Sequence, residues 1–308
     1  MRKILIVEIA EGLGNQLFMY AHAYTLSKKL GYDLQIDNLS GFSKKKNKLR
    51  THQKYMLDHF NITQNLADTN NTYENSLKRI KKKFELIFEN FKLKKKFIIE
   101  KNVKINNSKT ALPIIIPYTN NLSKLLYVQG NFENEAYFNY FKNDIIKMYK
   151  PLKKFINSDI EIINQLKNTN SVSIHVRKNK YSDQPHEIVN NERLIKSEKF
   201  TNDLLVYIKK SIFFFEKKLN NPTFFIWSND IDSIANHFKG KKFIYVRGND
   251  VINDFNLFSY AKHFIVGGST FHWWGAYLNA NPEKICVYPS KLNPSGNPNF
   301  YPTDWIKI

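Results

Sequence analysis

The segment SIHVRKNKY, residues 173–181, carries two side chains suited to binding an anion. His175 and Arg177 are two residues apart in an alternating, β-branched stretch, so a strand would point both side chains to one face. The planar guanidinium of arginine stays charged and matches pairs of phosphate oxygens. The segment therefore predicts an anion site, with a surface arginine beside a core histidine as the alternative.

The segment GGSTFHWWGAYLN, residues 267–279, is a second candidate anion site. Two glycines and two hydroxyls, Ser269 and Thr270, separate an expected strand from an expected helix. Backbone amides at a helix start bind anions because they lack partners within the helix and lie at the positive end of its dipole. The alternative is structural: a hydroxyl caps the helix, while Phe271, Trp273 and Trp274 fill the core.

A third segment, EGLGNQLF at residues 11–18, passes two glycines between an expected strand and an expected helix. Gly12 and Gly14 are spaced like the first glycines of the dinucleotide fingerprint G-x-G-x-x-G, but Leu17 stands at the third position. The segment is thus either a ligand-binding loop or a tight turn that packs the first helix.

Other catalytic patterns find little support in the sequence. Asp230 and Asp232 form a D-x-D pair, which binds a metal diphosphate in some sugar transferases, but Asp232 falls at an expected helix start, where capping is the simpler role. No G-x-S-x-G elbow or P-loop lysine is present, which disfavours hydrolases and kinases. Four histidines lack the spacing of a metal site: His22, His237, His263 and His272.

Composition bears on the compartment and the partners. The 308 residues carry a formal net charge of +20, which leaves three explanations: a solvated lysine-rich surface, an anionic membrane or, least favoured, nucleic acid. The lone Cys286 is expected to be a buried strand residue in a reducing compartment. The apolar start is too short for a signal peptide, and no run approaches a membrane span. We therefore expect a cytoplasmic protein, and peripheral contact with the inner face of the cytoplasmic membrane is left open.

Strand and helix signals alternate from the start of the chain. Residues 3–9, 15–30 and 33–37 predict strand, helix and strand, with Gly31 as a left-handed helix cap. Beyond them we expect a helix over 75–95, a short apolar run over 112–118, a strand over 124–132 and a helix that stops before Pro151. These elements predict a first domain over residues 1–151.

A second cycle of strands and helices follows. Strand signals at 171–177, 223–230, 242–246, 264–271 and 284–289 alternate with helix signals at 204–219, 231–238, 254–263 and 271–279. This alternation predicts a second doubly wound α/β domain, over residues 152–308. In such domains ligands bind at the carboxyl ends of the parallel strands.

Taken in order, six segments resemble the bacterial α-1,2-fucosyltransferases of glycosyltransferase family 11. They are GLGNQLF (12–18), VQGNFENEAYF (128–138), VSIHVR (172–177), FIWSND (225–230), AKHFIVGGSTFHWWGAYLNANPEKI (261–285) and DWIKI (304–308). Together they span nearly the whole chain in the order of the family.

The resemblance implies a fold and a reaction. The fold would be α/β and GT-B-like, with two Rossmann-like domains whose parallel sheets face each other across a cleft. The reaction would be the inverting transfer of L-fucose from GDP-fucose to the 2-hydroxyl of a galactose, with no metal or other cofactor. The acceptor would be a galactose-containing oligosaccharide of lipopolysaccharide or capsule biosynthesis, lipid-linked or free, and no nucleic acid would take part. Domain 1–151 would be mainly the acceptor side, and domain 152–308 would bind the GDP-sugar.

The resemblance also assigns roles to residues. Arg177, together with a helix amino end, would stabilise the charge that builds up on departing GDP. In the first loop, Gly12 and Gly14 would let the backbone approach the donor's sugar and diphosphate, and Asn15 would donate a hydrogen bond to them. Seven residues of the second domain would bind the donor: His175 at the nucleotide, Arg177 at the diphosphate, Asp254 at the guanine, Ser269, Thr270 and Phe271 at the phosphates, and Asn229 in the FIWSND segment.

The chain departs from the family pattern at five positions. Where the family usually has H-V-R-R-G-D-Y, this chain has HVRKNKY, with Lys178, Asn179 and Lys180 in place of Arg, Gly and Asp. Gly268 and His272 stand where asparagine and serine are usual. A lysine keeps the charge of an arginine but not its fork, so a changed donor or acceptor is a further possibility.

The catalytic base and the function class each keep alternatives. Four residues are candidates for the base that takes the acceptor proton, and the sequence singles out none of them: Glu11, which we include among the catalytic residues, and Asp183, His186 and Glu187. Two functions compete with fucose transfer: a related transferase for another GDP-sugar or acceptor, and an inactive basic protein that binds glycans or membrane surfaces.

Overall fold

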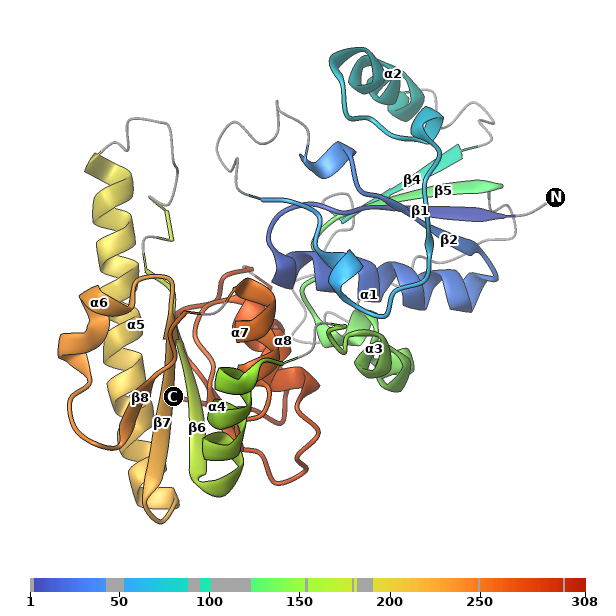
Figure 1. Cartoon of the computed structure of the whole chain (residues 1–308). Helices are drawn as coiled ribbons and strands as arrows, with labels where there is room; N and C mark the ends of the chain where they lie inside the picture. Colours follow the sequence, from blue (N-terminus) through green and yellow to red (C-terminus); the bar gives the residue numbers. More distant parts are fainter. Residues whose placement is uncertain are drawn as a thin grey trace. The chain divides into compact units, whose positions relative to one another are not determined.

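The computed structural model describes residues 3–42, 53–87, 95–100, 123–152, 155–178, 180–181, 191–248, 250–295 and 297–308. The chain divides into two compact units, Met1–Tyr149 and Lys150–Ile308, and each has its own parallel sheet (Figure 1). We call them the amino-terminal unit and the carboxyl-terminal unit. The prediction of an α/β protein with two Rossmann-like, parallel-sheet domains is confirmed.

The sheet of the amino-terminal unit has the strand order β3-β2-β1-β5-β4, and all its neighbouring strands pair in parallel. The strands are β1 (Ile4–Glu8), β2 (Asp33–Asp37), β3 (Asn65–Leu66), β4 (Lys95–Ile99) and β5 (Leu125–Gln129). The α-helices are α1 (Leu13–Leu30), α2 (Ser76–Ile87) and α3 (Lys142–Met148). Short 3-10 turns are η1 (Ser40–Phe42), η3 (Leu57–His59), η4 (Thr69–Asn71), η6 (Glu135–Tyr137) and η7 (Asn139–Phe141).

The helix α1 fixes the loop that precedes it. Its residues from Leu13 to Ser27 are almost all buried, as expected for a helix that is apolar on every side. It ends at Gly31, whose left-handed backbone (φ 68°) confirms the predicted cap. Because both ends of α1 are set, the loop between β1 and α1 has a fixed position within this unit.

The sheet of the carboxyl-terminal unit has the order β11-β10-β9-β6-β7-β8, again with parallel pairs throughout. Its strands are β6 (Asn170–Val176), β7 (Pro222–Ser228), β8 (Phe243–Tyr245), β9 (His263–Ile265), β10 (Cys286–Tyr288) and β11 (Ile306–Lys307). Its helices are α4 (Asn157–Asn168), α5 (Asn191–Lys218), α6 (Ile231–Ile234), the 3-10 turn η8 (Ala235–His237), α7 (Val251–Phe258) and α8 (Thr270–Leu278).

The core of this unit lies between the sheet and the long helix α5. Leu204, Ile208 and Phe215 of α5 are buried against Val172 and Ile174 of β6. Cys286 is buried in β10, and burial raises the pKa of its thiol to about 12, so the predicted unreactive strand residue is confirmed. Among the described residues, none of the helices is both long and apolar enough to cross a membrane.

Three expected elements differ in extent. The predicted end of the helix over 75–95 is wrong, because α2 ends at Ile87 and Lys95 is the first residue of β4. Before Pro151 the helix is only α3, preceded by two 3-10 turns. α5 begins at Asn191, well before residue 204, since a helix that is polar over its first turns gives a weak apolar signal. The apolar run 112–118 lies outside the described residues.

Candidate functional site

The carboxyl edge of the second sheet gathers most of the predicted donor-binding residues. β6, β7 and β9 are neighbours and parallel, so the segments that follow them meet at one edge. His175 lies next to the end of β6, opposite Trp227 of β7, and Arg177 follows at once. The strand thus places both predicted side chains at the edge where ligands bind in this fold.

His175 is held neutral at this edge. Burial, and to a lesser extent the charge of Arg177, lowers the pKa of His175 to about 3. Its Nδ1 atom is buried and meets no hydrogen-bond partner among the described residues. The ring centroid lies 5.7 Å from that of Phe271 and 5.6 Å from that of His272. A buried ring nitrogen without a partner costs free energy unless a ligand satisfies it.

The turn after β9 packs tightly against the end of β6. A Cβ atom on Gly267 would lie 3.3 Å from the carbonyl oxygen of His175, so a larger residue would push the turn away from the strand. His272, one turn further on, is buried, and its Nε2 atom lies 3.3 Å from the hydroxyl of Ser173. Burial lowers the pKa of His272 well below its usual value, so this ring is also neutral.

The amino end of α8 is open to an anion. Ser269 is the N-cap residue, yet its side chain makes no capping hydrogen bond, so of the two hydroxyls in the structural alternative that of Ser269 does not cap the helix. The first turn of α8 contains no acidic residue. The other part of the structural alternative is confirmed for Trp273 and Trp274, which are fully buried, but not for Phe271, which is half-buried. Backbone N–H groups at such a start, with a hydroxyl beside them, can bind phosphate.

Asp254 lies in the first turn of α7, a helix that contacts α8 through Phe255. The helix is capped by Asp250, whose carboxylate accepts from the backbone N–H groups of Ile252 and Asn253 at 3.0 and 2.9 Å. Phe255 packs its ring 5.5 Å from that of Phe271. Asp254 is half-buried, and its contact with a donor stays a prediction.

Asn229 holds the backbone that follows β6. Its side-chain oxygen accepts from the N–H of Lys178 at 2.8 Å, and its amide donates to the carbonyl of the same residue at 3.1 Å. Lys178 also pairs with Asp230 at 3.3 Å. Asn229 therefore positions the segment that carries Arg177, while its contact with a donor stays a prediction.

The D-x-D pair has structural partners. Asp230 is the N-cap of α6 and accepts from the N–H of Ser233, and Asp232 pairs with Arg247 at 2.7 Å. The capping role expected for Asp232 belongs instead to Asp230, while Asp232 lies in the first turn of α6. Within the described residues no three His, Cys, Asp or Glu side chains form a group that could hold a metal ion. Independence of a metal stays a prediction.

Two of the departures from the family pattern contact each other. The ammonium of Lys180 donates to the carbonyl oxygen of Gly268 at 3.2 Å and lies 4.4 Å from the ring centroid of Phe200. The lysine thus adds positive charge beside the turn that leads into α8. Asn179, Asp183, His186 and Glu187 lie outside the described residues.

The predicted loop of the amino-terminal unit has an unusual backbone. Glu11 has a left-handed conformation (φ 64°), which is uncommon for a residue with a side chain and tends to occur at functional sites. Its carboxylate accepts a hydrogen bond from the side chain of Asn15. The side-chain amide of Gln16 fixes the position of the loop, because it donates hydrogen bonds to the backbone carbonyls of Glu11 and Lys54, each at 2.8 Å.

The space beside Gly12 is open. Gly12 is the N-cap of α1, and a Cβ atom built on it would meet nothing within 4 Å among the described residues. Gly14 is buried in the first turn of the helix. Packing within this unit does not require a glycine at position 12, which leaves the close approach of a ligand as its predicted role.

A buried polar cluster at the carboxyl edge of the first sheet was missed from the sequence. Tyr127 donates to Asp37 at 2.6 Å and lies 3.0 Å from the carboxylate of Glu8. Lys82 of α2 pairs with Glu8 at 3.0 Å and donates to Gln129 at 2.9 Å. The signal was present in ILIVEIA, where a carboxylate interrupts a buried strand and therefore needs a partner. The partner, however, comes from a helix far along the chain.

Comparison with known proteins places the chain in a family. The sequence model of glycosyl transferase family 11 matches residues 4–307. The chain belongs to glycosyl transferase family 11. It is a glycosyltransferase, and the resemblance drawn from six segments is confirmed.

Two relatives from Escherichia coli cover the whole length. The chain is 29% identical to "Alpha-1,2-colitosyltransferase", over 99% of each chain. It is 27% identical to "O-antigen biosynthesis glycosyltransferase WbnK", over 97% of this chain and 99% of the relative.

Solved structures of fucosyltransferases are more distant. The fucosyltransferase NodZ from Bradyrhizobium is 13% identical, with 91% of this chain and 94% of that chain covered and a TM-score of 0.47. The R284K mutant of Arabidopsis thaliana FUT1 in complex with GDP is 10% identical, with 96% and 73% covered and a TM-score of 0.49.

Proposed function

We propose that this family 11 glycosyltransferase transfers L-fucose from GDP-fucose to the 2-hydroxyl of a galactose residue in a surface glycan. The observation that carries the proposal is the carboxyl edge of the second sheet. There a neutral, half-buried His175, whose buried Nδ1 has no partner among the described residues, lies with the cation of Arg177 and the amino end of α8. A nucleoside diphosphate has the hydroxyls and anionic oxygens that could bind to these three groups.

The same groups would assist bond breaking. As the bond from the sugar to GDP breaks, negative charge builds up on the diphosphate, and fixed positive groups at that point lower the barrier. Arg177 and the N–H groups at the start of α8 supply fixed positive charge, and Lys180 adds a further cation beside the turn. The acceptor hydroxyl then attacks from the opposite face of the sugar and loses its proton to a base.

Glu11 is our proposed base. Its carboxylate is oriented by Asn15, and its left-handed backbone is a local strain of about 1 kcal/mol that the fold maintains. Contacts of Gly12, Gly14 and Asn15 with the donor belong to the same proposal, as does a cytoplasmic place for the reaction.

A second candidate is transfer of another 6-deoxyhexose from its GDP conjugate. Two observations favour it: one relative is named a colitosyltransferase, and Lys180 and Gly268, which depart from the family pattern, contact each other at the donor edge. Colitose is L-fucose without its 3-hydroxyl, so a small change at the edge could decide between the sugars. The α-1,2 linkage is common to both candidates.

A donor-and-acceptor assay tests these proposals. Purified protein is incubated with GDP-fucose or GDP-colitose and a panel of terminal galactosides, and products are identified by mass spectrometry and by NMR of the linkage. We expect a 1,2-linked product, with higher kcat/KM for the preferred donor and no loss of rate in EDTA. Product from GDP-colitose alone would replace the first candidate by the second.

Failure to transfer either sugar, with GDP bound normally, would overturn both candidates and favour an inactive binding protein. Loss of activity in EDTA that Mg²⁺ restores would overturn metal independence alone.

A further inference from the structure

Helix α2 of the amino-terminal unit presents apolar side chains outward. Four of its residues are strongly exposed: Leu77 at 79%, Ile80 at 51%, Phe84 at 57% and Ile87 at 66%. They are three, four and three residues apart, which puts them in one stripe along the helix. No residue of α2 is fully buried. A surface helix normally turns its apolar stripe toward the core, so α2 is inverted.

Polar contacts hold α2 in this orientation. The side chain of Lys82 is only 12% exposed and reaches the buried carboxylate of Glu8 at 3.0 Å. Glu85, on the same inner side, accepts from the hydroxyl of Tyr73 at 2.5 Å and pairs with Lys95 at 3.6 Å. Rolling the helix to bury its apolar stripe would break these contacts and leave Glu8 buried without its cation.

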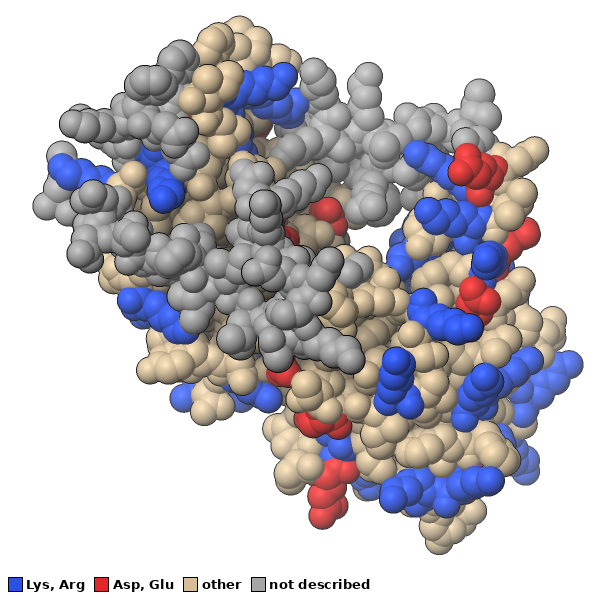
Figure 2. All heavy atoms as spheres, turned by 180° about the vertical axis from the view of Figure 1, so that it is seen from behind, with Lys and Arg blue, Asp and Glu red and all other residues tan. Residues whose placement is uncertain are grey.

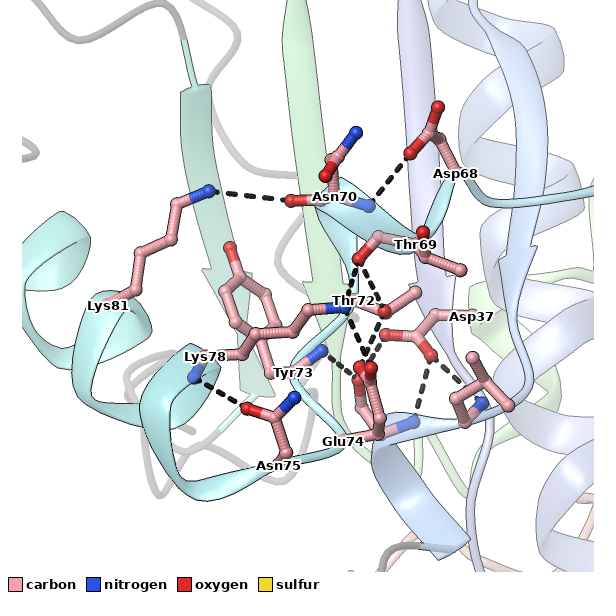
Figure 3. Close-up of polar contacts among 12 residues, drawn as sticks. Asp37, Asp68, Thr69, Asn70, Thr72, Tyr73, Glu74, Asn75, Lys78 and Lys81 are labelled. Atoms are coloured by element: carbon pink, nitrogen blue, oxygen red, sulfur yellow. Dashed lines mark hydrogen bonds and ion pairs between the residues drawn. The ribbon is translucent and has the colours of Figure 1, made fainter.

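The start of the helix is fixed as well. Figure 3 shows Asn75 accepting from the backbone N–H of Lys78 at 2.9 Å, and Lys81 reaching back to the carbonyl of Asn70 at 3.4 Å. The ammonium of Lys78 pairs with Glu74 at 2.7 Å. The outward position of the apolar stripe is thus determined at both the first turn and the inner face.

Lysines flank the apolar stripe. At about 100° of rotation per residue, Lys81 and Lys83 fall on opposite sides of it. Both residues are exposed. The surrounding charge is also positive, since the whole chain carries +20, and Figure 2 shows basic side chains spread over the described part of the face in view. An apolar stripe with a lysine on each side matches the boundary between the acyl chains and the anionic headgroups of a bilayer.

We propose that α2 docks the protein on an anionic phospholipid bilayer. Leu77, Ile80, Phe84 and Ile87 insert at the level of the first acyl carbons. Lys83 extends along this surface to the lipid phosphates, as long cationic side chains do at such boundaries, and Lys81 reaches them by exchanging its exposed contacts with Asn70 and Glu85 for a lipid phosphate. A lysine on each side of the stripe, in a chain of net charge +20, favours an anionic bilayer over a protein partner, whose apolar patch would need no anion on both sides. The inference goes beyond the transfer reaction and does not rest on the donor or the acceptor.

Vesicle flotation with the full chain tests this inference. Vesicles are made of phosphatidylcholine alone or with one third phosphatidylglycerol. We expect binding to the anionic vesicles and at least about tenfold weaker binding to the neutral ones. We expect the pair Ile80→Ser and Phe84→Ser to lower the bound fraction on anionic vesicles at least about fivefold, because the apolar stripe loses its centre. The pair Lys81→Glu and Lys83→Glu should abolish binding.

Matched controls come from α5. Phe213→Ser removes an equally exposed phenylalanine, at 58%, and Lys209→Glu with Lys210→Glu makes the same change in net charge on exposed residues. Both controls should bind as the wild type does, and every variant should keep its melting temperature and its rate on a water-soluble acceptor. If the α5 charge pair lowers binding as much as the α2 pair, α2 is not the docking element. A different outcome is that the wild type binds neither kind of vesicle, while the double variant Ile80→Ser and Phe84→Ser dissociates a dimer in size-exclusion chromatography. In that case the apolar stripe is an interface between copies of the chain, and the inference is overturned.

Discussion

The two sheets end in opposite ways at their carboxyl edges. In the amino-terminal unit, the buried carboxylates of Glu8 and Asp37 share the hydroxyl of Tyr127, and Lys82 from α2 completes the cluster. In the carboxyl-terminal unit, the edge carries a neutral His175 and the helix start at Ser269, whose side chain does not cap it. The first edge satisfies its polar groups with one another, whereas the second leaves Nδ1 of His175 without a partner among the described residues.

Substitutions at the two edges should therefore affect different properties of the protein. A residue whose partner is another buried residue contributes to stability, and its loss leaves a buried charge. A residue arranged toward a ligand contributes to binding or rate, and its loss leaves the empty protein unaffected. We therefore expect the first edge to respond to substitution in unfolding experiments and the second in assays.

The largest expected effect is on stability at the first edge. Lys82→Met leaves Glu8 buried without its cation, and we expect the free energy of unfolding to fall by about 3–5 kcal/mol. The matched control is the neighbouring Lys81→Met, an exposed residue 3.7 Å from Glu85, which should cost less than about 1 kcal/mol. Urea unfolding measures both. Adding Glu8→Gln to Lys82→Met should restore part of the lost free energy of unfolding. If Lys82→Met and Lys81→Met lowered the free energy of unfolding equally, Lys82 would not be the structural partner of the buried Glu8.

The next effect is on catalysis at the second edge. Arg177→Ala should lower kcat about 100- to 1000-fold, because a fixed charge on the departing diphosphate is lost, with no change in melting temperature. Arg177→Lys should recover only part of the rate, since the ammonium lacks the planar fork. Arg247→Ala, which removes an exposed arginine paired with Asp232, is the control and should keep its rate. A drop in melting temperature for Arg177→Ala comparable to that of Lys82→Met would make the arginine structural.

Stability should also fall in acid. Burial lowers the pKa of His22 and of His175 from 6.5 to about 3, so the unfolded chain takes up these protons first as the pH falls. The stability is therefore full above pH 6.5 and decreases through the window from 6.5 toward 3. Between pH 7.5 and 5.5 each such histidine should lower the free energy of unfolding by about 1.4 kcal/mol. His22→Phe, which keeps the ring stacked on Phe132, should show a smaller decrease in urea unfolding. An unchanged slope would mean that His22 titrates normally.

The smallest effect compares two helix starts within the second unit. Asp250→Ala removes two capping hydrogen bonds from α7 and should cost about 1 kcal/mol. Ser269→Ala removes no capping bond from α8 and should cost less than about 0.5 kcal/mol. With GDP added, Ser269→Ala should lose part of the thermal stabilisation that the wild type gains. A cost for Ser269→Ala as large as that for Asp250→Ala, without GDP, would show that the hydroxyl belongs to the fold.

Much of the fold followed from the sequence because each unit is made of local signals. Alternating strands and helices predicted two parallel sheets, and Gly31 marked the end of α1. The errors fall where local signals conflict with tertiary partners. Lys95 looked like part of a helix, but in β4 it is satisfied by Glu85 and Tyr73. The first turns of α5 are largely polar and carried too little apolar pattern to be recognised.

The candidate site was predictable to the extent that it is built from strand ends. His175 and the turn before Ser269 each follow a recognisable strand, and parallel strands bring such ends together. The cluster of Glu8, Asp37 and Lys82 was not predictable in the same way, because its members are brought together only by the packing of α2 on the sheet. The inward lysine and outward phenylalanine of α2 likewise need the structure, since the sequence alone shows only an amphipathic helix.

The most direct test of the account is GDP binding by isothermal titration calorimetry. We expect the wild type and Arg247→Ala to bind GDP with similar affinity, and Arg177→Ala to bind at least about tenfold more weakly at an unchanged melting temperature. Equal affinity of the wild type and Arg177→Ala for GDP would contradict the assignment of the donor site to the carboxyl edge of the second sheet.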